Sequence, residues 1–207
     1  MKKLLLTIFI AAISTCFSYG QLRIDTKKEL NYSHQSIIDF IKDNNFEYAL
    51  ISWGTSTWMY SERNFYCLFI QHGKYYLANI STSVIPQPKL LDQGIIVKQK
   101  LLTKIETDSV MKLIKPDSAF RYNQTDLDKL PRSCSYVKDG KTMGLYAIHD
   151  AATSFLMEYS NSKTRLLSYY AASEYLGACY PYVKEFGILK GLVNAADQLY
   201  GATKNLK

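Results

Sequence analysis

The residue types that usually carry out chemistry in proteins are few in this chain, and they are not spaced for joint action. The three histidines, His34, His72 and His149, lie far apart, and none stands four residues from another. Zinc sites commonly use histidine pairs at that spacing or a Cys-x-x-Cys motif, and the chain has neither. The sequence therefore predicts no metal site.

One serine stands in a turn that resembles half of a hydrolase nucleophile elbow. The segment Gly54-Thr55-Ser56-Thr57 has the first glycine of a Gly-x-Ser-x-Gly motif but not the second. Such a serine is exposed by a parallel sheet built from strand–helix units, and that pattern is absent from the sequence. No glycine-rich phosphate loop precedes a helix. We therefore predict no catalytic residue and no cofactor. The alternative is an exported hydrolase whose catalytic residues are dispersed along the chain.

Aromatic side chains are the most promising feature for binding, because the chain has 17 tyrosines and two tryptophans. Two groups stand out, one around the turn at Gly54 and one before the last helix. Their members are Trp53, Trp58, Tyr169, Tyr170, Tyr175 and Tyr180. Such rigid, amphipathic side chains supply contact area for a protein or glycan partner. We predict a binding surface from these six residues. The alternative is that they pack the junction between a hairpin and a helix, with their hydroxyls reaching water.

The first twenty residues have the pattern of a signal peptide. Two lysines precede an apolar block from Leu4 to Ile13 that is interrupted by Thr7 and is about half the length of a membrane helix. Small residues at Ser18 and Gly20 predict cleavage before Gln21. We therefore expect a signal peptide at residues 1–20, a single domain at residues 21–207, and a periplasmic or secreted protein.

Cys16 offers a second outcome for the same leader. The run Ile13-Ser14-Thr15-Cys16 resembles a bacterial lipobox, although Thr15 is larger than the residue usual before the lipidated cysteine. We predict membrane attachment only if Cys16 is lipidated. Otherwise Cys16 leaves with the signal peptide.

The mature chain keeps three cysteines, an odd number that cannot be fully paired within one molecule. Cys67 lies in the strand-like run 65–70 and is predicted to be a small buried side chain. Cys134 and Cys179 can form one disulfide in an oxidising compartment.

The charge of the chain is moderately basic. The sequence has 25 basic and 18 acidic residues, and two of the basic residues lie in the leader, so the mature chain keeps 23 and a net charge of +5. The basic residues are scattered, without the dense stripe and recognisable module of a nucleic-acid-binding protein. We predict no nucleic-acid partner.

Hydrophobic periodicity and turn residues predict an α+β fold. We expect helices at residues 31–45, 107–115, 126–130 and 181–200, the first capped by Ser33 or Ser36. Strands are expected at residues 46–53, 65–71, 74–80, 95–100, 134–138, 141–148, 154–159 and 165–170. The strands are joined into hairpins by His72-Gly73, by Asp139-Gly140 and by a loop from Ser160 to Lys163.

The last predicted helix has the clearest pattern. Pro181 suits its first position and Gly201 suits the position just past its end. Its apolar stripe consists of Tyr182, Phe186, Leu189, Val193, Ala196 and Tyr200, and it is broadened by Ile188, Leu192 and Leu199. A stripe of this width must be buried, and a sheet face is the natural partner. The sequence thus predicts a single antiparallel sheet of hairpins, a short N-terminal helix and a long C-terminal helix packed on the sheet. For function, we expect a non-enzymatic binding module of the bacterial envelope, toxin-neutralising or accessory to glycan and envelope handling.

Overall fold

The computed structural model describes residues 33–55, 62–83, 95–145 and 151–206, together with Leu22, Ile24, Leu30 and Ile148. The predicted leader, Cys16, Ser56 and Trp58 lie outside the described residues, so the expectations that rest on them stay predictions. No helix within the described ranges is both long and apolar enough to cross a membrane.

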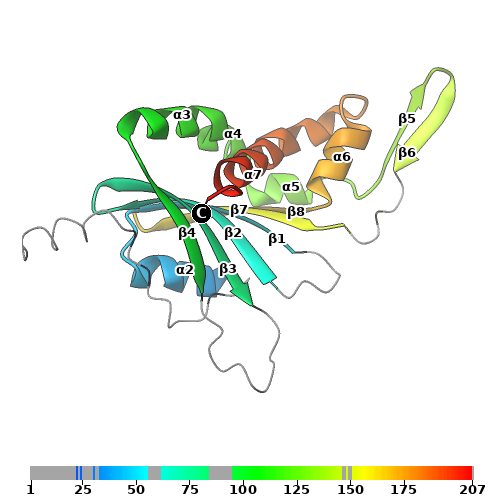
Figure 1. Cartoon of the computed structure of the whole chain (residues 1–207). Coiled ribbons are helices and arrows are strands. Elements are labelled where there is room, and N and C mark those ends of the chain that lie inside the picture. The colour runs from blue at the N-terminus through cyan, green and yellow to red at the C-terminus, as the bar shows by residue number, and fades with distance from the viewer. Residues whose placement is uncertain are drawn as a thin grey trace, which may run out of the picture.

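Six antiparallel strands form one large sheet, in the order β4-β3-β2-β1-β7-β8. The strands are β1 (Tyr48–Thr55), β2 (Glu62–Gln71), β3 (Lys74–Ser83), β4 (Ile96–Leu102), β7 (Thr153–Ser160) and β8 (Lys163–Tyr170). A short helix, α2 (His34–Asp43), covers one face, and the long C-terminal helix α7 (Leu189–Thr203) packs on the other (Figure 1). The predicted α+β fold, with an antiparallel sheet and a helix near each end of the chain, is confirmed.

The sheet separates two hydrophobic cores. Successive side chains of a strand point to opposite faces, so Leu50 of β1 lies in the core beneath α7. Ile51 and Trp53 lie in the core beneath α2. Five consecutive residues of β1 are buried, because helices cover both faces of the sheet.

The ends of α2 follow the sequence signals closely. Ser33, one of the two predicted caps, accepts a hydrogen bond from the Ser36 backbone N–H at 3.1 Å. The helix ends at Asn44, whose side-chain amide donates to the Phe40 carbonyl at 2.7 Å. The Gln71 side chain in turn donates to the Asn44 carbonyl at 2.8 Å, which joins the end of α2 to β2.

All three predicted hairpin turns are present. His72 and Gly73 have φ angles of 52° and 66°, and Asp139 and Gly140 have 53° and 72°. Two left-handed residues in succession form the turn that matches the twist of the flanking strands. The third turn is shorter than predicted, because Ser160 and Lys163 pair as strand residues and leave only Asn161 and Ser162 between β7 and β8.

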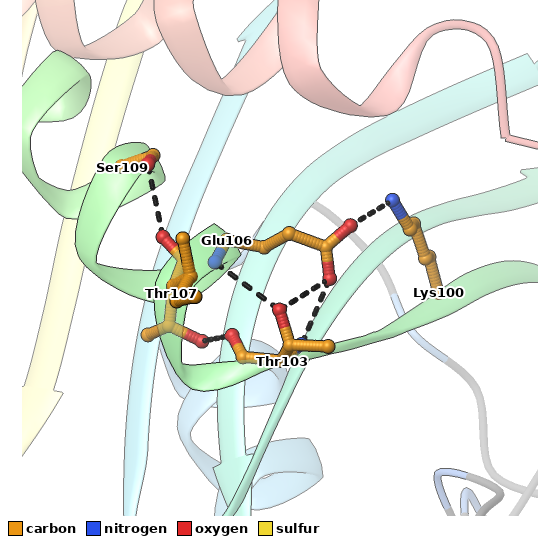
Figure 2. A network of polar contacts seen from close by, with 6 residues as sticks. Lys100, Thr103, Glu106, Thr107 and Ser109 are labelled. Carbon is orange, nitrogen blue, oxygen red and sulfur yellow. Dashed lines mark hydrogen bonds and ion pairs between the residues drawn. The ribbon is translucent and has the colours of Figure 1, made fainter.

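Helix α3 (Lys104–Ile114) begins three residues before its predicted start at Thr107. Its cap is Thr103, whose hydroxyl accepts from the Glu106 N–H, while the Glu106 carboxylate accepts from the Thr103 N–H at 2.8 Å (Figure 2). Lys100 donates to the other oxygen of Glu106 at 2.6 Å. This Thr-x-x-Glu capping box is readable in the sequence, and it explains why the helix begins at Lys104 and not at Thr107.

Two short helices, α4 (Pro116–Ala119) and α5 (Gln124–Asp128), follow α3. The helical turn predicted at residues 126–130 is α5, displaced by two residues. Asn123 and Asp126 form a second capping box, so Asp126 lies in the first turn instead of at the start.

The C-terminal helix differs from its prediction at both ends. Pro181 lies between α6 (Ala172–Cys179) and a 3₁₀ turn at Lys184–Ile188, and the α-helix begins only at Leu189, because the chain must first turn away from α6. Gly201 lies inside α7, which continues to Thr203. The buried Thr203 hydroxyl donates to the Leu199 carbonyl at 2.7 Å and holds the last turn.

The buried side of α7 follows one flank of the predicted stripe. Leu189, Leu192 and Leu199 are buried as expected, whereas Val193 is half-buried and Tyr200 is 47% exposed. The helix approaches α4 so closely that a Cβ atom on Gly191 would lie 2.7 Å from the Ser118 carbonyl oxygen. The periodicity of the helix alone does not indicate this contact with α4.

Candidate functional site

A two-stranded hairpin stands apart from the large sheet. It consists of β5 (Cys134–Lys138) and β6 (Lys141–Leu145), which pair only with each other. Figure 1 shows it projecting from the body of the molecule beyond α6. We call it the arm. An isolated hairpin of this length is only marginally stable in water, so contacts at its base must hold it.

The first such contact is a disulfide between Cys134 at the start of β5 and Cys179 at the end of α6. The two Cα atoms are 6.0 Å apart, and both residues are buried. This is the pair that the sequence offered as a possible bond. Cys67 lies fully buried in the core beneath α2, where burial raises the pKa of its thiol.

Two tyrosine hydroxyls hold the loop that enters the arm. Tyr169 of β8 donates to the Pro131 carbonyl at 3.0 Å, and Tyr175 of α6 donates to the Arg132 carbonyl. Burial raises the pKa of Tyr169 to about 12 and also raises the pKa of Tyr175, while the nearby Arg132 opposes both shifts. Both hydroxyls therefore stay protonated at neutral pH and act as hydrogen-bond donors.

Five of the six aromatic residues predicted to bind a partner lie in the described part of the chain, and these five do not form one surface. Trp53 is only 2% exposed and stacks on Phe155 at 4.9 Å in the core beneath α2. Tyr169 and Tyr175, exposed by 9% and 3%, lie in the core on the other face of the sheet. These two fit the alternative of packing at the hairpin–helix junction. However, their hydroxyls donate to backbone carbonyls and not to water.

Tyr170 and Tyr180 are half-buried and lie nearer the surface. The Tyr170 hydroxyl donates to the Ile148 carbonyl at 3.0 Å and accepts from the Ala151 N–H at 3.2 Å. The Tyr180 hydroxyl accepts from Lys190 at 2.9 Å. Each hydroxyl is therefore already engaged within the molecule. Trp58 lies outside the described residues, and its role stays a prediction.

Exposed apolar and aromatic groups lie instead on the arm. Tyr136 of β5 stacks on Tyr182 with ring centroids 4.2 Å apart, and Tyr182 is 46% exposed. Met143, which pairs with Tyr136 across the hairpin, is 45% exposed, and Val137, on the opposite face, is 69% exposed. We call Tyr136, Met143 and Tyr182, with the exposed Lys138 and Lys141 on the same face, the arm surface.

Sequence reasoning missed the arm surface because Tyr182 was assigned to the buried stripe of the C-terminal helix. One available signal was that Tyr136 and Val137 are neighbours on a strand. They must therefore place apolar groups on both faces of the hairpin. Unless other parts of the protein pack against both faces of such a hairpin, one apolar face is left exposed to solvent.

A cleft of about 420 Å³ lies beside the base of the arm. Its walls are α5, the loop at Arg132 and residues Ser168–Tyr170 of β8. Among the predicted aromatic residues that the structure describes, Tyr169 and Tyr170 line it. Cleft and arm share one support, because the Tyr169 and Tyr175 hydroxyls hold the loop that leads from one to the other.

A buried carboxylate on the sheet, Glu158, is the strongest acid–base candidate that the fold creates. It is only 7% exposed and pairs with Arg165, whose Nε donates at 2.7 Å. The Tyr48 hydroxyl donates to its other oxygen at 3.1 Å, and burial together with this carboxylate raises the pKa of Tyr48. The Arg165 guanidinium lies 4.5 Å from the centre of the Phe120 ring. Both oxygens of Glu158 are therefore engaged, and the arrangement attaches the helical layer to the sheet.

Within the described ranges, no three His, Cys, Asp or Glu side chains gather as metal ligands would. Comparisons of the chain with family models, curated proteins and solved structures found no match.

Proposed function

We propose that the chain is an exported, non-enzymatic binding module that contacts a protein partner through the arm surface. The observation that carries the proposal is the Tyr136–Tyr182 stack, which holds aromatic area in solvent on a hairpin fixed at its base. Tyrosine and methionine are enriched at the centres of protein interfaces. A surface that is already ordered also loses little conformational entropy on binding.

The charges on the arm favour an acidic partner. Lys138 and Lys141 face each other across β5 and β6 next to the turn, and Lys138 lies 5.8 Å from the Tyr182 ring. Asp139 is the single acidic residue in the hairpin. Lysines around an exposed aromatic pair speed the encounter with a surface of opposite charge and disfavour basic partners.

Export is supported by the leader pattern together with the Cys134–Cys179 bond, because structural disulfides persist mainly in oxidising compartments. A hydrolase is supported less well. The buried carboxylate Glu158 is held by Arg165 on one oxygen and by Tyr48 on the other, as expected for a structural ion pair. A toxin-neutralising protein or an accessory of envelope assembly would each use a rigid arm of this kind.

Site-specific crosslinking in the producing cells tests the proposal. A photoreactive amino acid replaces Met143, which lies on the same face of the arm as Tyr136, or, as a matched control, Leu113 on α3, which is 58% exposed. We expect one discrete crosslinked protein from position 143 and none from position 113. The same adduct from both positions, or none from either, would contradict the proposal.

Affinity measurements with the captured partner sharpen the test. Tyr182→Ala and Met143→Ala each remove side-chain area from the arm surface, and we expect binding about tenfold weaker for each. Leu113→Ala serves as the control and should bind as the unaltered protein does. Equal affinity of all three variants would show that the partner contacts another surface.

A further inference from the structure

The walls of the cleft are held in place by side-chain contacts to the backbone. The Gln124 side chain of α5 accepts from the Ser168 N–H at 2.7 Å and donates to the Ser168 carbonyl at 3.0 Å. The side chain thus hydrogen-bonds both the N–H and the carbonyl group of Ser168 in β8, as a neighbouring strand would. Tyr169 and Tyr170 fix the neighbouring segments through their hydroxyls. The cleft is therefore formed before any ligand enters.

Two opposite charges face this cleft without being paired to each other. The Arg132 guanidinium takes part in none of the ion pairs found in the described residues, and its side chain is exposed. Asp128 is also exposed. One of its oxygens accepts from the Gln124 amide at 2.7 Å, so hydrogen-bonding capacity remains for a ligand. An arginine fork is suited to a planar carboxylate, and a carboxylate oxygen accepts from hydroxyl groups.

The cleft also offers apolar area and sufficient size. Leu127 and Leu130 line it next to Tyr169 and Tyr170. Its volume of about 420 Å³ lies within the range usual for small-molecule sites. A sugar ring presents C–H groups on its faces and hydroxyls around its rim, which matches a lining that combines apolar side chains with polar groups.

We propose that this cleft binds a sugar acid, with the ligand carboxylate on Arg132 and a ring hydroxyl donating to Asp128. The ligand can be a free hexuronate or the terminal uronate of a polysaccharide, since both present the same groups. The site goes beyond the protein-binding arm and does not depend on it.

Calorimetry on the mature chain tests this site with four small probes. Glucuronate has both a sugar ring and a carboxylate. Glucose has the ring without the carboxylate, and acetate has the carboxylate without the ring. Glycine has a carboxylate and an ammonium group but neither ring nor hydroxyls. We expect glucuronate to bind more tightly than the other three. A uronate-terminated oligosaccharide then distinguishes the two sources, because tighter binding than that of free glucuronate indicates a polysaccharide end.

Three variants assign the contacts. Arg132→Gln keeps the backbone carbonyl that accepts from Tyr175, so the fold should persist while glucuronate binds at least about tenfold more weakly. Asp128→Asn should weaken it several-fold. Lys141→Gln, on the arm, should leave glucuronate binding unchanged but weaken binding of the protein partner. Failure of the cleft and failure of the arm are therefore separate results.

The sugar-acid proposal is overturned if glucuronate and the oligosaccharide both fail to bind, or if glucose, acetate or glycine binds as tightly as glucuronate. Unchanged glucuronate affinity in a folded Arg132→Gln protein also overturns it.

Discussion

Two hairpins of this protein share almost the same turn but have different surroundings. β2–β3 turns at His72-Gly73 and β5–β6 at Asp139-Gly140, with φ angles within about 6° of each other at matching positions. The strands of the first hairpin have ten residues each and lie between β1 and β4. Those of the second have five residues each and, among the described residues, no neighbouring strand.

The difference shows that turn residues specify which segments pair but not what supports the pair. β2–β3 is supported by buried side chains such as Phe69, which is fully buried and stacks on Phe46 at 4.1 Å. The arm is supported by a disulfide and by hydrogen bonds at its base, and it leaves Val137 in solvent. The first arrangement stabilises the core, whereas the second keeps a surface available for a partner.

The largest expected contrast comes from truncating one apolar side chain in each hairpin. Phe69→Ala leaves a cavity in the core and should lower the free energy of unfolding by about 3–5 kcal/mol. Val137→Ala removes an exposed side chain and should change it by less than about 0.5 kcal/mol. Urea denaturation of both variants measures the difference. Similar losses in the two variants would mean that the arm is part of the cooperative core.

Removing the disulfide should act mainly on the arm. In the double variant Cys134→Ser, Cys179→Ser, we expect the free energy of unfolding to fall by about 2–4 kcal/mol, because the disulfide closes a loop with a sequence separation of 45 residues. Amide hydrogen exchange should accelerate in β5 and β6 but stay slow in β2 and β3. Cys67→Ala is the control for removing a thiol and should leave exchange in the arm unchanged. Protection retained in the arm of the double variant would contradict its dependence on the bond.

Replacing the glycine of each turn by alanine compares the two hairpins directly. A Cβ atom on Gly73 or Gly140 would contact nothing within 4 Å, so alanine adds only the cost of a left-handed backbone, about 1 kcal/mol. In Gly73→Ala, thermal unfolding of the whole protein should report this cost. In Gly140→Ala, we expect little change in the melting temperature and faster exchange confined to the arm. Equal shifts in melting temperature would show that both turns belong to one cooperative unit.

The smallest effect is expected from acid pH at the end of β4. Hydrogen bonds from Lys100 and then from Thr103 lower the pKa of Glu106 from 4.5 to about 2. A carboxyl whose pKa is lower in the folded state stabilises that state above the unfolded value, and this contribution disappears as the pH falls from about 4.5 to 2. Amide exchange at Glu106 and Thr107 should therefore quicken over this range, while exchange in the arm stays constant. Glu106→Gln should make exchange at these amides independent of pH once the intrinsic rate is subtracted. Unaltered pH dependence in that variant would assign the titration to another group.

Local signals predicted the elements better than their ends. Ser33 before α2 and the three hairpin turns were readable because each acts within a few residues. The end of α7 was not readable from local sequence. The helix continues past Gly201 to the buried Thr203, and the residue types near Gly201 do not indicate that burial. The candidate site was predicted least well. Aromatic residues look alike in sequence, whether they are stacked inside a core, as Trp53 is, or held in solvent, as Tyr182 is.

The sequence by itself determined the fold class, the hairpin pairs and the cysteines that were available for bonding, since these depend on periodicity, turn conformation and composition. Only the tertiary structure decided that helices cover both faces of the sheet, that Tyr169 and Tyr175 hold a loop, and that the arm remains outside the sheet. Burial is shared between segments distant in the chain, so no short stretch of sequence records which of its apolar side chains will be covered.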